Sequence, residues 1–179
     1  MTVWVALLRA VNVAGVNRLP MEELRGLLAD KGLLGVKTYI QSGNVVFRSN
    51  LGATALGPLI ADAVLARFGF RPPVLMLSRG ELDAAVAANP FATEAPEKVY
   101  FFFMERDLPR ATGDFLKSVA VPGERYAYRG RVLWLHLPEG MGRSKLAERV
   151  MKLPLDITGR NLKSVTAIAT LAQKLEAAG

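Results

Sequence analysis

The segment from Thr38 to Phe47, TYIQSGNVVF, constrains the fold more than any other part of the chain. Two runs rich in β-branched and aromatic residues flank a Ser-Gly-Asn tip, a pattern typical of a β-hairpin. The centre of the turn is either Ser42-Gly43 or Gly43-Asn44. Side chains alternate along a strand, so with either centre one face carries Thr38, Ile40, Val45 and Phe47. The opposite face carries Tyr39, Gln41, Val46 and Arg48.

The order of apolar runs predicts the elements around this hairpin. The first half contains a strand over 3–11, a helix over 20–31, the hairpin, a helix over 53–68 and a strand over 72–77. This β-α-β-β-α-β order is the split pattern of a ferredoxin-like unit. The second half contains a strand over 99–104, a helix over 109–119, a hairpin over 125–137 turning at Arg129-Gly130, and helices over 144–153 and 161–178. It repeats the order of the first half without its last strand.

We therefore expect an α+β protein of two packed ferredoxin-like subdomains, with mainly antiparallel sheets and helices on one face. Residues 1–78 form the first subdomain, residues 79–98 a connecting helix and loop, and residues 99–179 the second subdomain with an extra C-terminal helix. The sequence leaves open whether the two sheet faces are exposed or form an interface between the halves. It also does not indicate an oligomeric state.

Composition limits the classes of function. The chain has no cysteine, which excludes disulfides and thiol catalysis and fits a reducing compartment. The start of the chain lacks a basic region and a cleavage site, and the apolar run over 3–13 is too short to span a bilayer. We expect a cytoplasmic protein without a membrane partner.

The net charge of +7 is concentrated in one stretch. Between Arg125 and Lys163 there are nine basic and three acidic residues, a local excess of +6. Such an excess favours an anionic partner, either a small molecule or a nucleic acid, although a solvated arginine-rich surface gives the same count.

Three places are candidates for binding an anion or phosphate. The segment from Gly140 to Lys145 (GMGRSK) follows a predicted strand and opens a helix, where Arg143, Ser144 and Lys145 add charge and a hydroxyl to free N–H groups. It lacks the Walker spacing, and the simpler reading is that Ser144 caps the helix. The other candidates are Arg160 with Asn161, and Arg9 with Asn12 and Arg18. For these, ion pairing or hydrogen bonding within the protein is the alternative.

The outer sheet faces supply a different set of candidates. Aromatic and basic side chains on an open ferredoxin-like sheet are typical of RNA recognition. The residues are Tyr39, Gln41, Arg48, Arg125, Trp134 and His136. The predicted register places Arg125 across from Trp134, which suits a cation–π pair. His136 is the only histidine and has no clustered partner, so we expect no metal site and no cofactor, and catalytic residues are unknown. Whether the protein is an enzyme stays open.

Five separated stretches carry recognisable motifs, namely 7–15 (LLRAVNVAG), 38–47 (TYIQSGNVVF), 89–91 (NPF), 140–146 (GMGRSKL) and 158–161 (TGRN). Together they resemble the bacterial domain-of-unknown-function family numbered 1697. Ala10 and Ala14 stand where the family commonly has glycine, and Leu162-Lys163-Ser164 stands where it usually has Trp-Asn-Thr. The resemblance implies an α+β protein with ferredoxin-like subdomains. It implies no known activity, cofactor or catalytic residue, because the family is uncharacterised.

The function that these observations favour is binding of a phosphorylated small molecule or nucleotide at a basic site between the subdomains. The alternatives are binding of RNA or single-stranded nucleic acid on an open sheet face, and an interaction or structural role without a small-molecule ligand.

Overall fold

The computed structural model describes residues 1–179, which divide into two compact units. Unit 1 comprises residues 1–84 and 166–179, and unit 2 comprises residues 85–165. Two helices therefore contribute to both units, namely α3 (Arg79–Ala87) and α6 (Leu162–Ala177). The end of α6 lies in unit 1, although the boundaries expected from the sequence group it with the second half. No helix combines the length and the apolar composition needed to cross a membrane.

Unit 1 contains a four-stranded antiparallel sheet with the strand order β2-β3-β1-β4. Its elements follow the ferredoxin-like order predicted from the sequence. They are β1 (Thr2–Leu8), α1 (Met21–Asp30), β2 (Leu34–Tyr39), β3 (Asn44–Ser49), α2 (Ala53–Phe68) and β4 (Val74–Ser78). The strand predicted over 3–11 ends at Leu8, because Ala10 and Asn12 adopt the left-handed backbone conformation, which ends an extended strand.

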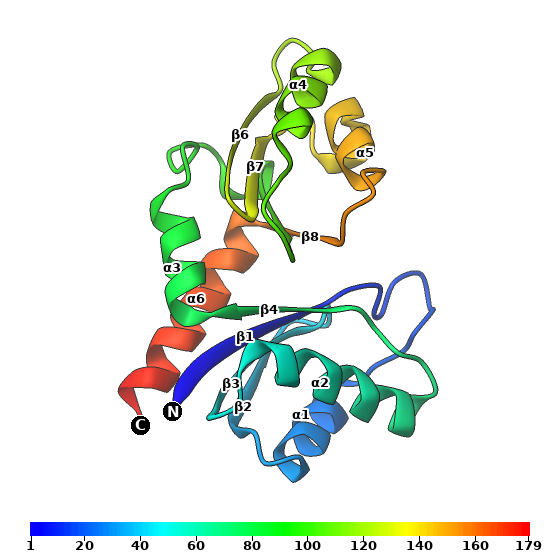
Figure 1. The fold of residues 1–179 in the computed structure, drawn as a ribbon, viewed down its shortest axis with the longest axis vertical. Coiled ribbons are helices and arrows are strands. Elements are labelled where there is room, and N and C mark those ends of the chain that lie inside the picture. Colours follow the sequence, from blue (N-terminus) through cyan, green and yellow to red (C-terminus); the bar gives the residue numbers. More distant parts are fainter. The chain divides into compact units, whose positions relative to one another are not determined.

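Helices lie on both sides of this sheet (Figure 1). On one side α1 and α2 close an apolar cluster that includes Ala6, Leu8, Leu24, Leu28, Val45, Phe47, Ile60 and Val64. The other sheet face is buried as well, since Val46 is only 1% exposed. The C-terminal part of α6 packs against unit 1, where a Cβ on Gly35 would lie 2.6 Å from Leu175 Cδ1. Arg79 at the start of α3 pairs with Glu176 of α6 at 2.9 Å.

Unit 2 repeats the topology of unit 1, with the strand order β6-β7-β5-β8. Its elements are η1 (Pro96–Lys98), β5 (Val99–Met104), α4 (Arg110–Val119), β6 (Arg125–Arg129), β7 (Val132–His136), η2 (Met141–Arg143), α5 (Lys145–Met151) and β8 (Ile157–Asn161). The fold class predicted from the sequence is confirmed: the chain is an α+β protein with two ferredoxin-like units.

The prediction that the second half lacks its last strand was wrong. Strand β8 pairs antiparallel with β5, and Gly159 lies opposite Phe102. A Cβ on Gly159 would come within 2.8 Å of Phe102 Cε1, so the aromatic ring occupies the space that a larger residue would need. This glycine and its polar neighbours give the segment a loop-like composition, which concealed the strand.

The register predicted for the second hairpin was also wrong. Arg129 pairs with Val132, so the two-residue turn is Gly130-Arg131. Gly130 has a φ of 55°, and a type II′ turn needs a positive φ at this first central position. Arg125 consequently lies across from His136 instead of Trp134. The pairing has moved by two residues, so each side chain keeps the face that was predicted for it.

Candidate functional site

Two loops meet at one end of the unit 1 sheet, and Asn12 joins them. Its Nδ2 donates to the carbonyl oxygens of Leu19 at 2.9 Å and Gln41 at 2.7 Å, and its Oδ1 accepts from the Leu19 N–H at 2.7 Å. The amide of Asn12 is therefore engaged by the protein itself. Arg9 is half-buried, with its backbone N–H donating to Pro73 at 3.0 Å, and Arg18 is exposed. These contacts give Asn12 a structural role, because its side chain holds the two loops together.

The tip of the first hairpin is wider than the sequence suggested. Tyr39 pairs with Asn44, which leaves Ile40–Gly43 as a four-residue loop. Ile40 has a φ of 47° and is 53% exposed, so the prediction that it shares the core face of Val45 and Phe47 was wrong. Asn44 is fully buried, and its Nδ2 donates to the carbonyl of Tyr39 at 3.1 Å, which closes this loop.

In unit 2, Ser144 caps α5. Its Oγ accepts from the Ala147 N–H at 2.9 Å, and the residue is only 4% exposed. The N–H of Leu146 faces Glu124 Oε2 at 3.4 Å, so a carboxylate of the protein already lies at this helix start. Sequence reasoning missed Glu124, which is far from α5 in the chain. An anion at this place must therefore be held by side chains, because the protein's own oxygens engage these amides.

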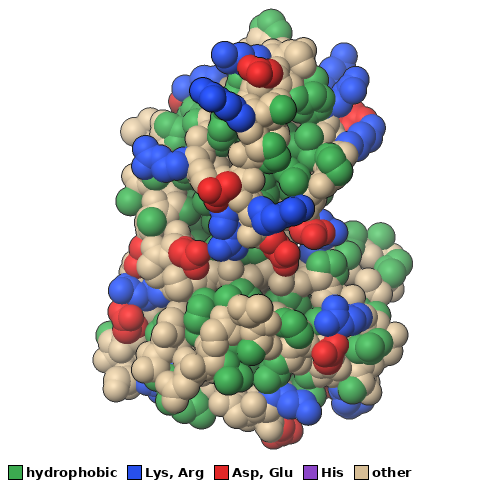
Figure 2. Space-filling view, in the orientation of Figure 1, with side chains coloured by type: hydrophobic (Ala, Val, Ile, Leu, Met, Phe, Trp, Pro, Cys, Tyr) green, Lys and Arg blue, Asp and Glu red, His purple; other side chains and the backbone are tan.

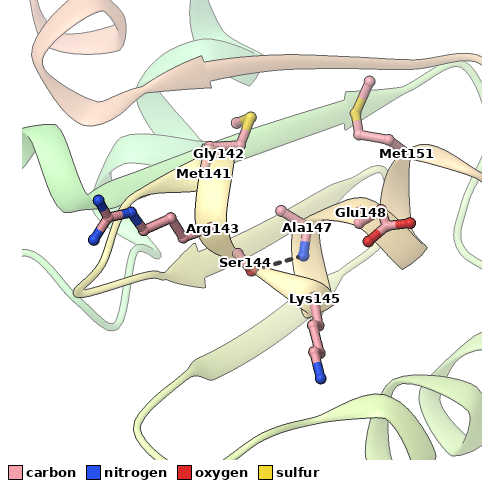
Figure 3. Close-up of a pocket in the computed structure, with 8 residues that line it drawn as sticks. All are labelled: Met141, Gly142, Arg143, Ser144, Lys145, Ala147, Glu148 and Met151. Atoms are coloured by element: carbon pink, nitrogen blue, oxygen red, sulfur yellow. Dashed lines mark hydrogen bonds between the residues drawn. The ribbon is translucent and has the colours of Figure 1, made fainter.

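Arg143 and Lys145 line two hollows in the surface of unit 2. The first, here called the α5 hollow, has a volume of about 410 Å³ and is lined by Met141, Gly142, Arg143, Ser144, Lys145, Ala147, Glu148 and Met151. The second, the Glu124 hollow, has the same volume and is lined by Val121, Pro122, Gly123, Glu124, Pro138, Glu139, Arg143 and Lys145. Figure 3 shows that the side chains of Arg143 and Lys145 leave the turn between η2 and α5 in different directions. Both cations are exposed, and neither forms an ion pair within the protein.

The two hollows differ in their acidic residues. The α5 hollow contains one, Glu148, which accepts a hydrogen bond from Lys152 of the next helical turn. This hydrogen bond and the charge of Lys152 hold the pKa of Glu148 below its ordinary value, so the carboxylate is ionised at neutral pH. The Glu124 hollow contains two acids, Glu124 and Glu139, against the same two cations. The α5 hollow is therefore the more favourable place for an anion.

Two of the basic side chains between Arg125 and Lys163 are paired with acids of the protein. Arg125 is paired with Glu94, and Lys152 is paired with Glu148. Figure 2 shows Lys and Arg side chains interspersed with Asp and Glu on the face in view. Of the other basic residues in this stretch, Arg143 and Lys145 line a hollow.

Arg160 and Asn161 lie at the end of β8, outside the lining of either hollow. The Oδ1 of Asn161 accepts from the Ser164 N–H at 2.9 Å, in the manner of a side chain that caps the start of α6. Arg160 donates to the carbonyl of Gly159 at 2.8 Å, and burial lowers the pKa of its guanidinium to about 10. Both side chains therefore form hydrogen bonds within the protein.

The sheet-face candidates of unit 2 are mostly covered. Trp134 is 3% exposed and donates its indole N–H to the carbonyl of Ala85 at 3.2 Å. The guanidinium of Arg125 lies 5.0 Å from the ring centre of Phe91, so the predicted pair with Trp134 was wrong. The ring of Trp134 is therefore not accessible for stacking with a base.

His136 has a carboxylate neighbour that the sequence did not reveal. Glu94 Oε2 lies 3.6 Å from His136 Nε2, and Arg125 Nη2 lies 3.0 Å from His136 Nδ1. Glu94 also accepts a hydrogen bond from Arg125, which holds the pKa of this carboxylate below its ordinary value. The three side chains lie together beside Phe91, and Arg125 and Glu94 form an ion pair. No group of three or more His, Cys, Asp and Glu side chains in the chain is placed to hold a metal ion.

The remaining sheet-face candidates of unit 1 do not share one surface. Tyr39 and Gln41 are at the hairpin tip, the first half-buried and the second exposed. Arg48 is half-buried near the other end of β3, where it pairs with Val3 across the sheet. The structure therefore does not bring these three residues together.

The structure is that of an α+β protein of two ferredoxin-like units, and the second unit carries the two hollows that Arg143 and Lys145 line. The model of the family described as "Protein of unknown function (DUF1697)" matches residues 1–134, and the chain belongs to this family, as its motifs suggested. The matched region ends before Arg143 and Lys145. Among solved structures, the conserved bacterial protein SP0830 from Streptococcus pneumoniae is similar, with 26% identity and a TM-score of 0.77 over 96% of this chain and 98% of that chain. A search of the curated proteins found no match.

Proposed function

We propose that the protein binds a phosphorylated small molecule at the α5 hollow. The observation that carries the proposal is the pair Arg143 and Lys145, two exposed cations without ion-pair partners that line one hollow of about 410 Å³. Concave sites of roughly 300–1,000 Å³ are the size that small-molecule ligands occupy. A guanidinium offers a planar fork of donors to phosphate oxygens, and an ammonium adds a mobile point charge.

The surroundings of these cations favour an external anion over an internal partner. Glu148 is the only acid in the lining, and its charge is partly balanced by Lys152 at i+4. Glu124 accepts from the backbone of Leu146 and does not pair with Arg143 or Lys145. A bound phosphate would therefore meet two cations that form no ion pair, of which Lys145 already interacts electrostatically with Glu148.

Calorimetric titration with inorganic pyrophosphate at low salt tests the proposal. The double variant R143Q/K145Q is compared with R149Q/K163Q, which removes the same charge from exposed residues outside the lining. Two exposed cation–phosphate contacts are worth about one or two kcal/mol, so the first variant should bind about 5–30-fold more weakly than wild type. The second should lose little, and added salt should weaken wild-type binding.

Equal losses in the two variants would show that net charge attracts the anion and would refute a site at the hollow. Undetectable binding of pyrophosphate to the wild type would refute the proposal as a whole.

A further inference from the structure

His136, the only histidine of the chain, lies in unit 2 between a cation and a carboxylate. Its side chain is 12% exposed. Arg125 is its cross-strand neighbour in the β6–β7 hairpin, and the guanidinium Nη2 lies 3.0 Å from the imidazole Nδ1. Glu94 approaches the other ring nitrogen, with Oε2 3.6 Å from Nε2. On β5 the residue opposite His136 is Val99, so the charged groups that contact the ring are Arg125 and Glu94.

The contact with Arg125 fixes the tautomer of this imidazole. A guanidinium carries only hydrogen-bond donors, so Nδ1 of His136 must present its lone pair to Arg125. A neutral imidazole has one protonated nitrogen, and the proton of His136 is therefore on Nε2, beside Glu94. The neutral ring thus accepts from the cation and has its polar N–H next to the anion.

The imidazole is one of three contacts that hold Arg125. Its Nη2 also donates to Glu94 Oε1, and its guanidinium lies 5.0 Å from the ring centre of Phe91. Phe91 is 6% exposed, and its ring centre lies 6.0 Å from that of His136. The side chain of Arg125 is nevertheless 51% exposed, so the guanidinium can move into water without displacing a buried group.

Protonation of His136 reverses the sign of one of these contacts. The second proton would sit on Nδ1, so two donors and two positive charges would face each other across 3.0 Å. The imidazolium would also attract Glu94 at Nε2. Glu94 stays ionised through this step, because the hydrogen bond from Arg125, and then the charge of His136, hold its pKa below its ordinary value. Histidine is the side chain whose charge ordinarily changes near neutral pH.

We infer that His136 is a proton-operated switch for Arg125. The neutral ring holds the guanidinium over Phe91, whereas the protonated ring pairs with Glu94 and releases Arg125 to solvent. The loop that carries Glu94 and Phe91 stays attached to the sheet in both states, and the edge strand β6 presents an additional free cation in acid. The inference does not depend on the anion site proposed above, because none of these residues lines the α5 hollow.

Nitrogen-15 NMR over a pH titration of the full chain tests the inference. The single histidine gives one pair of imidazole signals, so these signals need no assignment. Above the titration they should show a protonated Nε2 and an unprotonated Nδ1, and a nuclear Overhauser effect should connect the Arg125 side chain with the Phe91 ring. That effect should disappear in the same pH step in which Nδ1 gains its proton.

Three variants separate the role of the imidazole from that of charge in general. His136→Gln cannot take up the proton, so its contact between Arg125 and Phe91 should persist over the same pH range. Arg125→Met removes the donor and should let the ring populate the Nδ1-protonated tautomer. Arg129→Met removes the same charge from an exposed residue of β6 that does not contact the ring, and it should leave the wild-type tautomer unchanged.

An imidazole protonated on Nδ1 above the titration would overturn the assignment of the tautomer, and the switch with it. A contact between Arg125 and Phe91 that survives protonation of the wild-type ring would overturn the release of Arg125. Loss of that contact in His136→Gln at the same pH would do so as well, because the imidazole would not be its cause. The wild-type titration decides the first two outcomes even where a variant fails to fold.

Discussion

Replacing Gly43 with alanine should destabilise unit 1 through two separate effects. Gly43 closes the first hairpin with a φ of 78°, and its carbonyl accepts from the Leu8 N–H at 2.8 Å. A Cβ at this position would lie 2.8 Å from both Leu8 Cβ and Val11 Cγ2. The left-handed backbone raises the free energy of an alanine by roughly 1–2 kcal/mol. Overpacking against two fully or nearly fully buried side chains adds about 1–3 kcal/mol.

Gly69 offers a matched control for the backbone effect alone. It follows α2 with a φ of 81°, and a Cβ there would meet nothing within 4 Å. Gly69→Ala should therefore lower the free energy of unfolding by about 1–2 kcal/mol, and Gly43→Ala by about 2–5 kcal/mol. The difference between the two variants measures the contact with Leu8 and Val11.

Urea denaturation followed by tryptophan fluorescence is the assay. Trp4 lies in unit 1 and Trp134 in unit 2, so a Trp134→Phe background leaves a single reporter for the sheet that contains Gly43. The free energies are obtained from the midpoints and slopes of the transitions. Equal destabilisation by the two alanines would mean that the hairpin tip moves away from β1 without cost. The close packing inferred from the Cβ distances would then be refuted.

Two further predictions concern unit 2. Ser144→Ala should lower the free energy of unfolding by about 1 kcal/mol, because the Ala147 N–H loses its acceptor, and thermal melting should show the loss. Glu94→Gln should reduce stability at neutral pH, because the folded protein holds the pKa of Glu94 below its unfolded value. That contribution is present above the unfolded pKa and disappears as the pH falls through the folded pKa. Urea titrations of wild type and variant should therefore converge in acid, and a constant difference would contradict the assignment.

The sequence predicted the fold class because the signals for it are local. The first hairpin has two runs of β-branched and aromatic residues around a Ser-Gly-Asn tip, and the apolar periods of α1 and α2 are distinct from those of the strands. Strand β8 was missed because it contains Gly159, and a glycine is needed there since the ring of Phe102 leaves no room for a larger residue. That requirement is a tertiary contact, and no local pattern carries it.

At the candidate site, too, the local signals could be predicted from the sequence and the tertiary contacts could not. The cap at Ser144 was foreseen as an alternative, since a serine before an apolar helical run is a local signal. The acidic residues that contact this helix start and Arg125 were not foreseen. Glu124 approaches Leu146 and Glu94 pairs with Arg125, across 22 and 31 residues of sequence. Charge counts along the chain therefore do not show which cations are paired, because the pairing of charges depends on the packing of distant segments.

The residues in the left-handed backbone conformation indicate a structural reason for the family motifs in unit 1. Apart from glycines, the residues with positive φ are Ala10, Asn12, Ala14, Asn17 and Ile40. All of them lie in the two loops that the side chain of Asn12 joins. A non-glycine residue in this conformation is strained and persists only where its surroundings fix it.

The family resemblance places glycine at positions 10 and 14, and the structure gives φ values of 58° and 49° there. Backbone conformation is therefore sufficient to explain the preference for glycine, without a ligand approaching the loop. It follows that Ala14→Gly should not destabilise the protein. Relief of roughly 1–2 kcal/mol of strain exceeds the roughly 0.4–1 kcal/mol that glycine adds to the entropy of the unfolded chain. The same substitution at Ala29, an exposed residue near the end of α1, should destabilise by about 1 kcal/mol. If the two substitutions have the same effect on the urea midpoint, strain in the loop does not account for the motif.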